Sequence, residues 1–182
     1  MTSSEASAID LRYPIGRFDS SIPVTSEHVE EALADMSRLP AALYAAVRGL
    51  TPEQLEIPHR VGGWCPRQIA HHIPDSHMNG YMRMKLALTE DAPAIKTYEQ
   101  ERWAELGDVR SAPIEASLAL LEALHTRWVA LGHSLSKADW RRVYVQPDGR
   151  RVPIDLHICL YAWHGRHHVA QITSLRERMG WV

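Results

Sequence analysis

Four long segments of the chain carry apolar residues at the three- and four-residue spacing of an amphipathic helix. The stretches between them are richer in proline, glycine and polar residues and lack this period. Four such segments are typical of an all-α protein with a four-helix bundle, in which each helix buries its apolar face against its neighbours. The predicted helices cover residues 25–49, 66–90, 113–131 and 155–179.

The predicted helix ends depend on capping residues and prolines. Thr25 or Ser26 is a good N-cap for the first helix, and Asp155 is expected to cap the fourth. A proline in a helix interior removes one backbone hydrogen bond and crowds the preceding turn. We therefore expect Pro40 to kink or divide the first helix and Pro74 to kink the second.

The segments outside the helices differ in character. Residues 1–24 are predicted to form an irregular N-terminal arm, and Thr51 starts a short helical turn. Residues 91–112 show little periodicity and form a long connection. The segment 142–153 alternates apolar residues around the turn sequence Pro147-Asp-Gly, which predicts a small β-hairpin before the last helix.

Length and composition restrict the class of protein. A chain of 182 residues fits a single domain, 1–182, and 45% hydrophobic residues argue against global disorder. The formal net charge of −2 excludes a broadly basic nucleic-acid-binding protein, and no apolar run approaches the roughly 20 residues of a membrane-spanning helix. Residues 1–10 lack the features of a signal peptide, and two cysteines, Cys65 and Cys159, give no disulfide framework. We expect a cytoplasmic protein.

Histidine is abundant, and six of the eleven histidines fall in two short clusters. His164 and His168 are four residues apart in the fourth helix, so both imidazoles project from one face, as a helix-bound metal ion requires. A third ligand must come from a facing helix. In the cluster on the second helix, His72 shares the apolar face with Ile69, whereas His71 shares a more polar face. His72 is therefore the better third ligand.

The other clustered histidines are given different roles. His167 is rotated by about 100° from His168, so it does not share the same ion easily. His77 lies between two faces of the second helix and is interpreted as a neighbour of the ligands or as a surface residue. The alternative for the pair His164 and His168 is two hydrogen-bonded, half-buried imidazoles that bind no metal.

Three imidazoles favour Zn²⁺, Ni²⁺ or Fe²⁺ over the oxygen-seeking Mg²⁺ and Ca²⁺. Three protein ligands leave coordination positions open for water or substrate, which is typical of a catalytic site. Asp75 is the acidic residue closest in sequence to His72, and it is predicted to orient a histidine or, as the alternative, to act as general base. Ser76 and Asn79 share the face of His72 and are predicted to line the pocket.

Five groups of short segments, in order from about residue 11 to 181, match a known protein family. They are Tyr13-Pro-Ile-Gly16, Gly62-Gly-Trp64 with Arg67-Gln68, His71-His72 with Asp75-Ser-His-Met-Asn79, Lys85-Leu-Ala-Leu-Thr-Glu90, and Tyr161-Ala-Trp-His164 with His167-His168. In these segments the sequence resembles the DinB superfamily of metal-binding four-helix bundles, and most closely its YfiT-like branch. The resemblance implies a bundle with an unusual helix order and a divalent metal, nickel or zinc, on His72, His164 and His168. It also implies a cytoplasmic homodimer.

Members of the YfiT-like branch are described as metal-dependent hydrolases, so the leading hypothesis is a hydrolase acting on a small molecule. The first alternative is an S-transferase that uses a low-molecular-weight thiol of the bacillithiol, mycothiol or glutathione type. The second is a metal-binding stress-response module without catalysis. No nucleic acid or membrane is expected as a partner.

Overall fold

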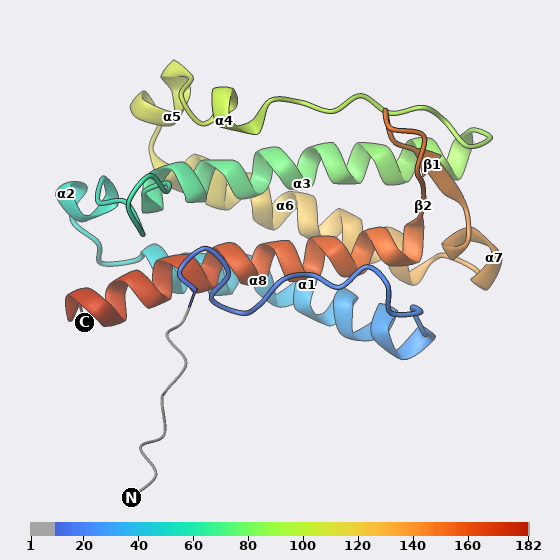
Figure 1. Cartoon of the computed structure of the whole chain (residues 1–182), viewed down its shortest axis with the longest axis horizontal. Coiled ribbons are helices and arrows are strands. Elements are labelled where there is room, and N and C mark those ends of the chain that lie inside the picture. Colours follow the sequence, from blue (N-terminus) through green and yellow to red (C-terminus); the bar gives the residue numbers. More distant parts are fainter. Residues whose placement is uncertain (1–9, 182) are drawn as a thin grey trace, which may run out of the picture.

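The computed structural model describes residues 10–181, so the first nine residues of the predicted arm lie outside the described part. Four long helices and a β-hairpin account for most of it (Figure 1). The elements are α1 (Ser26–Val47), α2 (Pro52–Leu55), α3 (Pro66–Thr89), α4 (Gln100–Trp103), α5 (Gly107–Ser111), α6 (Ile114–His133), α7 (Lys137–Trp140), β1 (Val143–Val145), β2 (Arg151–Pro153) and α8 (Ile154–Met179).

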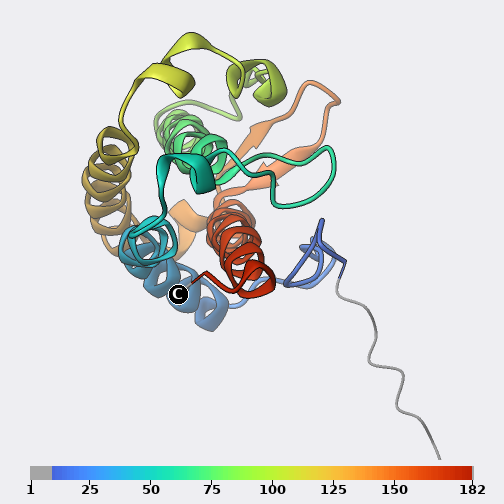
Figure 2. The ribbon, with the colours of Figure 1, turned by 90° about the vertical axis from the view of Figure 1, so that its left-hand side faces the viewer.

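The four long helices form a bundle in which helices that follow one another in sequence are not all neighbours. Helix α1 packs against α6 and α8, and α3 packs against the same two helices. Viewed from the end of the bundle, α1 and α3 therefore occupy opposite corners (Figure 2). The predicted four-helix bundle is confirmed, and its order places α3 beside α8, which carry the two histidine clusters.

Apolar residues fill the two ends of the bundle, and histidines occupy the layer between them. One apolar cluster includes Met36, Met84 and Trp128, and the other includes Leu43 and Ile69. Each long helix contributes to both clusters, so its middle turns lie between them. The buried histidines of these middle turns are His77, His125, His167 and His168, and buried His72 lies next to them, beside Ile73 of the second cluster.

The prolines do not divide their helices. Pro40 lies inside α1 and Pro74 inside α3, and both helices continue past them. The expectation that Pro40 might divide the first helix is therefore wrong. Burial of Leu39 and Leu43 on either side of Pro40 stabilises the continuous helix, because tertiary packing outweighs the loss of one backbone hydrogen bond.

Some predicted boundaries also need correction. The N-cap of α8 is Pro153, so Asp155 does not cap the helix. Asp155 lies in the first turn, where the helix dipole stabilises a negative charge. Its carboxylate forms an ion pair with Arg141 at 3.0 Å. The long connection 91–112 contains α4 and α5, two helices too short to show a period in the sequence.

The β-hairpin is confirmed. Strands β1 and β2 pair antiparallel, with Tyr144 opposite Val152, and Gly149 in the turn has a φ of 83°. Tyr144 is buried against α8 through a hydrogen bond from its hydroxyl group to Nδ1 of His157 at 2.9 Å. The hairpin thus covers the end of the bundle where α8 begins.

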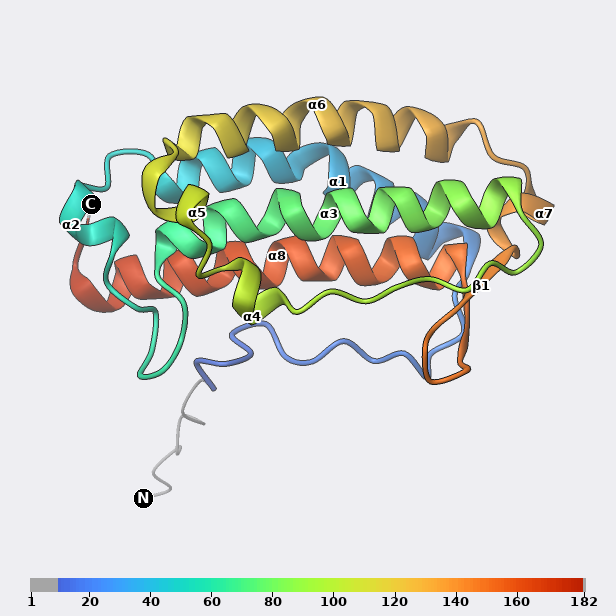
Figure 3. The same ribbon diagram turned by 90° about the horizontal axis from the view of Figure 1, so that it is seen from above.

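The arm and two loops lie on one side of the bundle. Figure 3 shows the arm from residue 10 and the connection after α3 on the same side of α8. The loop between α2 and α3 projects toward this side as well (Figure 2). Among residues 10–181, no helix is long and apolar enough to cross a membrane.

Candidate metal centre

The structure brings together His72 of α3 with His164 and His168 of α8. One ring nitrogen from each histidine lies within 4.8 Å of the other two. The Nε2 atoms of His72 and His164 are 3.2 Å apart. The spacing of four residues puts His164 and His168 on one face of α8, and the bundle order turns this face toward α3. The three rings are therefore placed to bind one cation.

A chain of buried hydrogen bonds fixes the protonation of His164. It begins at the carbonyl oxygen of Met36 in α1. In a regular helix the backbone N–H of residue 40 would donate to this oxygen, but Pro40 has no N–H. Nδ1 of His125 lies 2.5 Å from this oxygen and must donate to it, since a carbonyl only accepts. This leaves a bare lone pair on Nε2 of His125, which accepts from Nδ1 of His77 at 2.8 Å.

The same reasoning continues to the cluster. Nε2 of His77 is then an acceptor, so Nδ1 of His164 donates to it at 3.1 Å. His164 consequently presents a bare Nε2 lone pair to His72 and His168. The chain links all four long helices and holds the ring in the form that binds a metal.

A second hydrogen-bond chain fixes His168. The side-chain amide of Gln171 donates to the carbonyl oxygen of Arg12 at 3.4 Å, which determines which amide atom is nitrogen. Its oxygen therefore accepts from Nδ1 of His168 at 2.9 Å, and Nε2 of His168 is left bare. The other amide hydrogen is donated to Nε2 of His167 at 3.0 Å. Gln171 thus connects the arm, His167 and the cluster.

Burial keeps these imidazoles neutral. It lowers the pKa of His72, His164 and His168 well below the usual histidine range, and the neighbouring histidines lower it further. Burial also lowers the pKa of His125 to about 4. Neutral imidazole is the form of histidine that binds metals, so the cluster is ready to accept a cation at neutral pH.

The donor set fits a divalent transition metal. The Nε2 lone pairs of His164 and His168 are bare, and a ring nitrogen of His72 lies within 4.8 Å of the nitrogens of both rings. Nitrogen ligands suit zinc, nickel and iron. No carboxylate and no cysteine among the described residues joins the cluster within the same 4.8 Å. The ion would thus have three protein ligands and room for others.

The other predicted residues lie outside this cluster. His71 is buried rather than on a polar face, because it turns toward α6, where its Nδ1 lies 2.8 Å from the hydroxyl of Ser117. His167 stacks on Trp163 with ring centroids 4.8 Å apart. His77 has no exposed surface and contacts His164, so the surface alternative for it is wrong.

The residues predicted to line the pocket are also placed elsewhere. Asn79 lines a hollow between α3 and the connection 91–106 and donates to the carbonyl oxygen of Asp75. Ser76 is buried. Burial, with the nearby charge of Asp108, raises the pKa of Asp75 to about 6. None of Asp75, Ser76 and Asn79 lines the hollow beside His168.

A hollow of about 280 Å³ opens beside His168. Trp64 borders it, packs on His72 with ring centroids 4.4 Å apart, and donates from its indole nitrogen to Glu101 at 3.0 Å. One histidine of the cluster, His168, is among the residues that line this hollow. Its lining is Arg12, Tyr13, His59, Arg60, Gly62, Gly63, Trp64, Gln100, Glu101, His167, His168 and Gln171.

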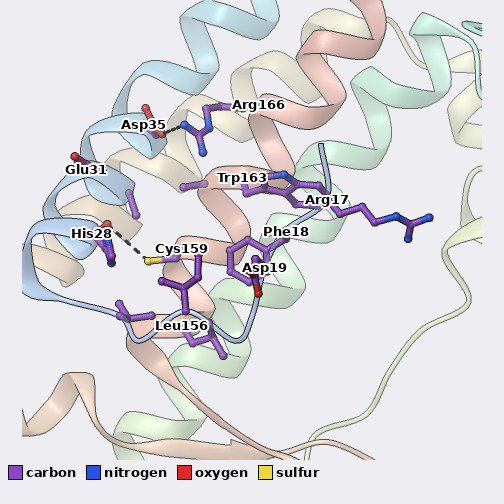
Figure 4. Close-up of a pocket in the computed structure, with 14 residues that line it drawn as sticks. Arg17, Phe18, Asp19, His28, Glu31, Asp35, Leu156, Cys159, Trp163 and Arg166 are labelled. Carbon is purple, nitrogen blue, oxygen red and sulfur yellow. Dashed lines mark hydrogen bonds and ion pairs between the residues drawn. The ribbon is translucent and has the colours of Figure 1, made fainter. Parts of the chain in front are cut away.

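A separate hollow of about 350 Å³ lies between the arm, α1 and α8 (Figure 4). Phe18 of the arm faces Trp163 there, and Asp35 forms an ion pair with Arg166 at 3.0 Å. None of the three clustered histidines lines this hollow. This hollow therefore does not reach the cluster, whereas the hollow beside His168 does.

Three residues of the site were missed in the sequence. His125 lies four residues after Leu121 and three before Trp128, so the spacing of apolar residues in the third helix already indicated that it points inward. Gln171 follows His168 by three residues and was also on the same side of its helix. Glu101 gave no signal, because it reaches Trp64 from a connection without periodicity.

Known proteins similar to this chain share its fold, and several of them are named as metal-dependent. A profile of the DinB superfamily matches residues 35–172. Proteins named "Putative metal-dependent hydrolase" from Bacillus cereus and Bacillus anthracis are 49% identical over 172 residues, which cover 94% of this chain and 99% of each relative.

Two solved structures are similar. YfiT from Bacillus subtilis, described as a probable metal-dependent hydrolase with an unusual four-helix bundle topology, superimposes with a TM-score of 0.92 and 42% identity. The alignment covers 96% of this chain and all of YfiT. A mycothiol-dependent maleylpyruvate isomerase shares the fold, with a TM-score of 0.58 and 16% identity over 81% of this chain and 61% of that protein.

Proposed function

Since the chain belongs to the DinB superfamily, we propose that it is a metal-dependent hydrolase whose metal is held by His72, His164 and His168. The observation that carries the proposal is the convergence of three histidines, of which His72 and His168 are buried and His164 is partly buried. Two of them, His164 and His168, have their Nδ1–H committed to hydrogen bonds and their Nε2 bare. Such a set binds a cation and leaves coordination positions for water and substrate.

We infer the physiological ion to be zinc or nickel, both of which suit nitrogen ligands. When bound, the metal would supply Lewis acidity and lower the pKa of water toward neutrality. The side chains of the protein supply the rest. Trp64 covers one side of the histidine cluster and limits the access of bulk water. Glu101 is the carboxylate of the adjoining hollow, and we assign it the role of general base.

The Glu101 assignment replaces Asp75, which lies outside that hollow. Trp64 holds the Glu101 carboxylate by donating to Oε2 at 3.0 Å, while the other oxygen has no protein donor among the described hydrogen bonds. A carboxylate with one free oxygen can accept a proton from water or from substrate.

We also propose that the protein is cytoplasmic and dimeric. Both cysteines are free thiols, as expected in a reducing compartment. The α3 residues Met78, Met82 and Leu86, at intervals of four, expose apolar side chains that a second copy could cover. Light scattering coupled to size-exclusion chromatography gives the mass, and a monomer at micromolar concentration would contradict the dimer.

The catalytic proposal is tested by removing the metal with a chelator and restoring it. We expect the zinc- or nickel-loaded protein to cleave members of a panel of small esters and amides, and the metal-free protein to be inactive. His164→Ala should abolish cleavage, whereas His133→Ala, which changes an exposed histidine at the end of α6, should not.

The same preparation decides between hydrolysis and thiol transfer. It is incubated with monochlorobimane and with bacillithiol, mycothiol or glutathione. Metal-dependent conjugation without ester or amide cleavage would replace the hydrolase proposal with an S-transferase. Metal binding with neither reaction would favour a module that binds metal without catalysis.

A further inference from the structure

The hollow between α3 and the connection 91–106 has a volume of about 690 Å³. The connection runs back alongside α3 and forms the outer wall of this hollow (Figure 1). Met82 and Leu86 line the hollow from α3, and Tyr98 and Trp103 line it from the wall. It shares no lining residue with the hollow beside His168. Its volume suits a small organic molecule.

The wall of this hollow is fixed at both ends. Near its start, the backbone N–H of Ile95 donates to the carbonyl oxygen of Val145 in β1 at 3.0 Å. Near its end, Nε2 of Gln68 in α3 donates to the carbonyl oxygen of Ala104 at 3.2 Å. The space is therefore formed before a ligand binds, which avoids the entropic cost of ordering the wall on binding.

Positive charge in the hollow is only partly compensated. Arg102 is paired with Glu99 at 3.4 Å. Arg83 and Lys96 also line the hollow, and neither forms an ion pair with a carboxylate among residues 10–181. Three cations and one carboxylate thus face the same space, and the two uncompensated charges attract an anion.

The guanidinium of Arg83 is held in place but keeps a free donor. Nη2 donates to the carbonyl oxygen of Lys96 at 3.2 Å, and Nη1 donates to the hydroxyl oxygen of Tyr161 at 3.5 Å. Nε forms no hydrogen bond with residues 10–181, but it is not buried. Arg83 therefore presents an accessible charged N–H group, which forms strong hydrogen bonds with carboxylates.

The apolar part of the lining favours an anion with an aromatic body. The rings of Tyr98 and Trp103 lie with their centroids 4.5 Å apart. Aromatic rings attract other rings in stacked or edge-to-face arrangements. A doubly charged phosphate loses more hydration than a singly charged carboxylate when it enters an apolar site. The lining thus suits an aromatic carboxylate better than an aromatic phosphate.

A second copy of the chain is the competing occupant, because Met82 and Leu86 also belong to the apolar row that we assign to the dimer contact. Apolar side chains of a second copy would cover this row but would leave Arg83 without a counter-ion. Covering a charge without giving it a partner is unfavourable. The charge of the hollow therefore favours an anionic ligand over an apolar contact.

We propose that this hollow is a binding site for a small aromatic carboxylate. The carboxylate pairs with Arg83 and Lys96, and the aromatic body lies against Tyr98 and Trp103. This inference goes beyond the proposed hydrolase, because the binding requires neither the metal nor a reaction.

Binding is tested by calorimetry on zinc-loaded protein with 2-naphthoate and three reference compounds. Neutral 2-naphthamide keeps the rings without the charge, acetate keeps the charge without the rings, and 2-naphthyl phosphate carries a second charge. We expect 2-naphthoate to bind more tightly than all three, and about 10-fold or more over the amide, the value of a charged hydrogen bond. A reference compound that binds as tightly as 2-naphthoate would overturn the proposal.

Arg83→Met removes the charge, and we expect it to abolish most of the preference for 2-naphthoate over 2-naphthamide. A variant that only disturbed the wall would weaken both compounds alike and keep the preference. Arg110→Met is the matched control, since Arg110 is exposed and paired with Glu105 outside the hollow. An unchanged preference in folded Arg83→Met would overturn the proposal. If thermal melting shows that Arg83→Met is unfolded, Lys96→Met, which changes an exposed residue, decides in the same way.

Two further measurements exclude other binding modes. A carboxylate can bind a metal directly, so the titrations are repeated after chelation, and we expect the preference for 2-naphthoate to persist. Loss of the preference with the metal would show that the compound binds the ion, and would overturn the proposal. An affinity that falls as the protein concentration rises would show that a second copy fills the hollow, and would overturn it as well.

Discussion

The adjacent residues His167 and His168 differ in what they contact, although both are buried. His168 belongs to the three-histidine cluster, and His167 stacks on Trp163. We expect His168→Ala to lose most of its metal and His167→Ala to keep it, since a site with two imidazoles binds a divalent ion far more weakly than one with three. Metal content per chain is measured by mass spectrometry after gel filtration. Equal losses of metal in the two variants would contradict the assignment of His168, and not His167, as a metal ligand.

His77 acts on the metal centre only through His164, so we regard it as a positioning residue. His77→Phe removes the acceptor for Nδ1–H of His164, and we expect the metal dissociation constant to rise by about 10- to 100-fold. A competition titration with a chromophoric chelator measures this constant.

The control for His77→Phe is His71→Phe on the same helix, which removes a hydrogen bond to Ser117 but no hydrogen bond to a metal ligand. The visible spectrum of the cobalt-substituted protein adds a readout of ligand geometry. It should change in His77→Phe and not in His71→Phe, and a loss of stability alone would change neither spectrum.

At the scale of the helices, the close approach of α3 to its neighbours depends on Gly80. A Cβ atom there would lie 2.4 Å from Cζ of Tyr161 and 2.7 Å from Cη2 of Trp128. The methyl group of Gly80→Ala must push the rings of Tyr161 and Trp128 away from α3, so we expect the free energy of unfolding to fall by ~1–3 kcal/mol. Because Tyr161 packs against His164, with ring centroids 5.9 Å apart, metal affinity should fall as well.

Gly107→Ala is the control for this substitution, since nothing lies within 4 Å of a Cβ atom at Gly107. Urea unfolding of the metal-free proteins compares the two. A Gly80→Ala protein as stable as Gly107→Ala would show that the helices can move apart without cost.

For the whole molecule, buried neutral histidines make stability depend on pH. Burial lowers the pKa of His125 and His157 to about 4 in the folded protein, whereas an unfolded histidine titrates near 6.5. Below pH ~6.5 the unfolded chain binds more protons than the folded one, so the free energy of unfolding decreases as the pH falls toward about 4. The loss at pH ~5 is on the order of 2 kcal/mol for each of these groups.

Asp75 has the opposite effect, because its pKa is raised to about 6 and the folded state gains a proton first as the pH falls. One carboxyl does not offset several histidines, so we expect a lower urea midpoint at about pH 5 than at about pH 7.5 for metal-free protein. An unchanged or higher midpoint at the acidic pH would contradict the neutral histidine layer.

Much of the fold was determined by the sequence itself. The apolar periods placed the four long helices, and Gly149 after Pro147-Asp placed the hairpin turn. The phase of a helix is a local property, so it also selected His164 and His168 as a pair and His72 over His71. The short helices α4, α5 and α7 were not predicted, because four or five residues are too few to show a period.

The tertiary structure alone decided which groups from different helices meet. The order of the bundle brings His125 of α6 to His77 of α3. Because Pro40 has no N–H, the carbonyl oxygen of Met36 is free to accept the hydrogen bond from His125 at the start of this chain of hydrogen bonds. The hollow beside His168 likewise joins an arm, a loop, α4 and α8. Sequence periods describe one helix at a time, whereas these contacts depend on the packing of segments up to about 160 residues apart, such as Arg12 and Gln171.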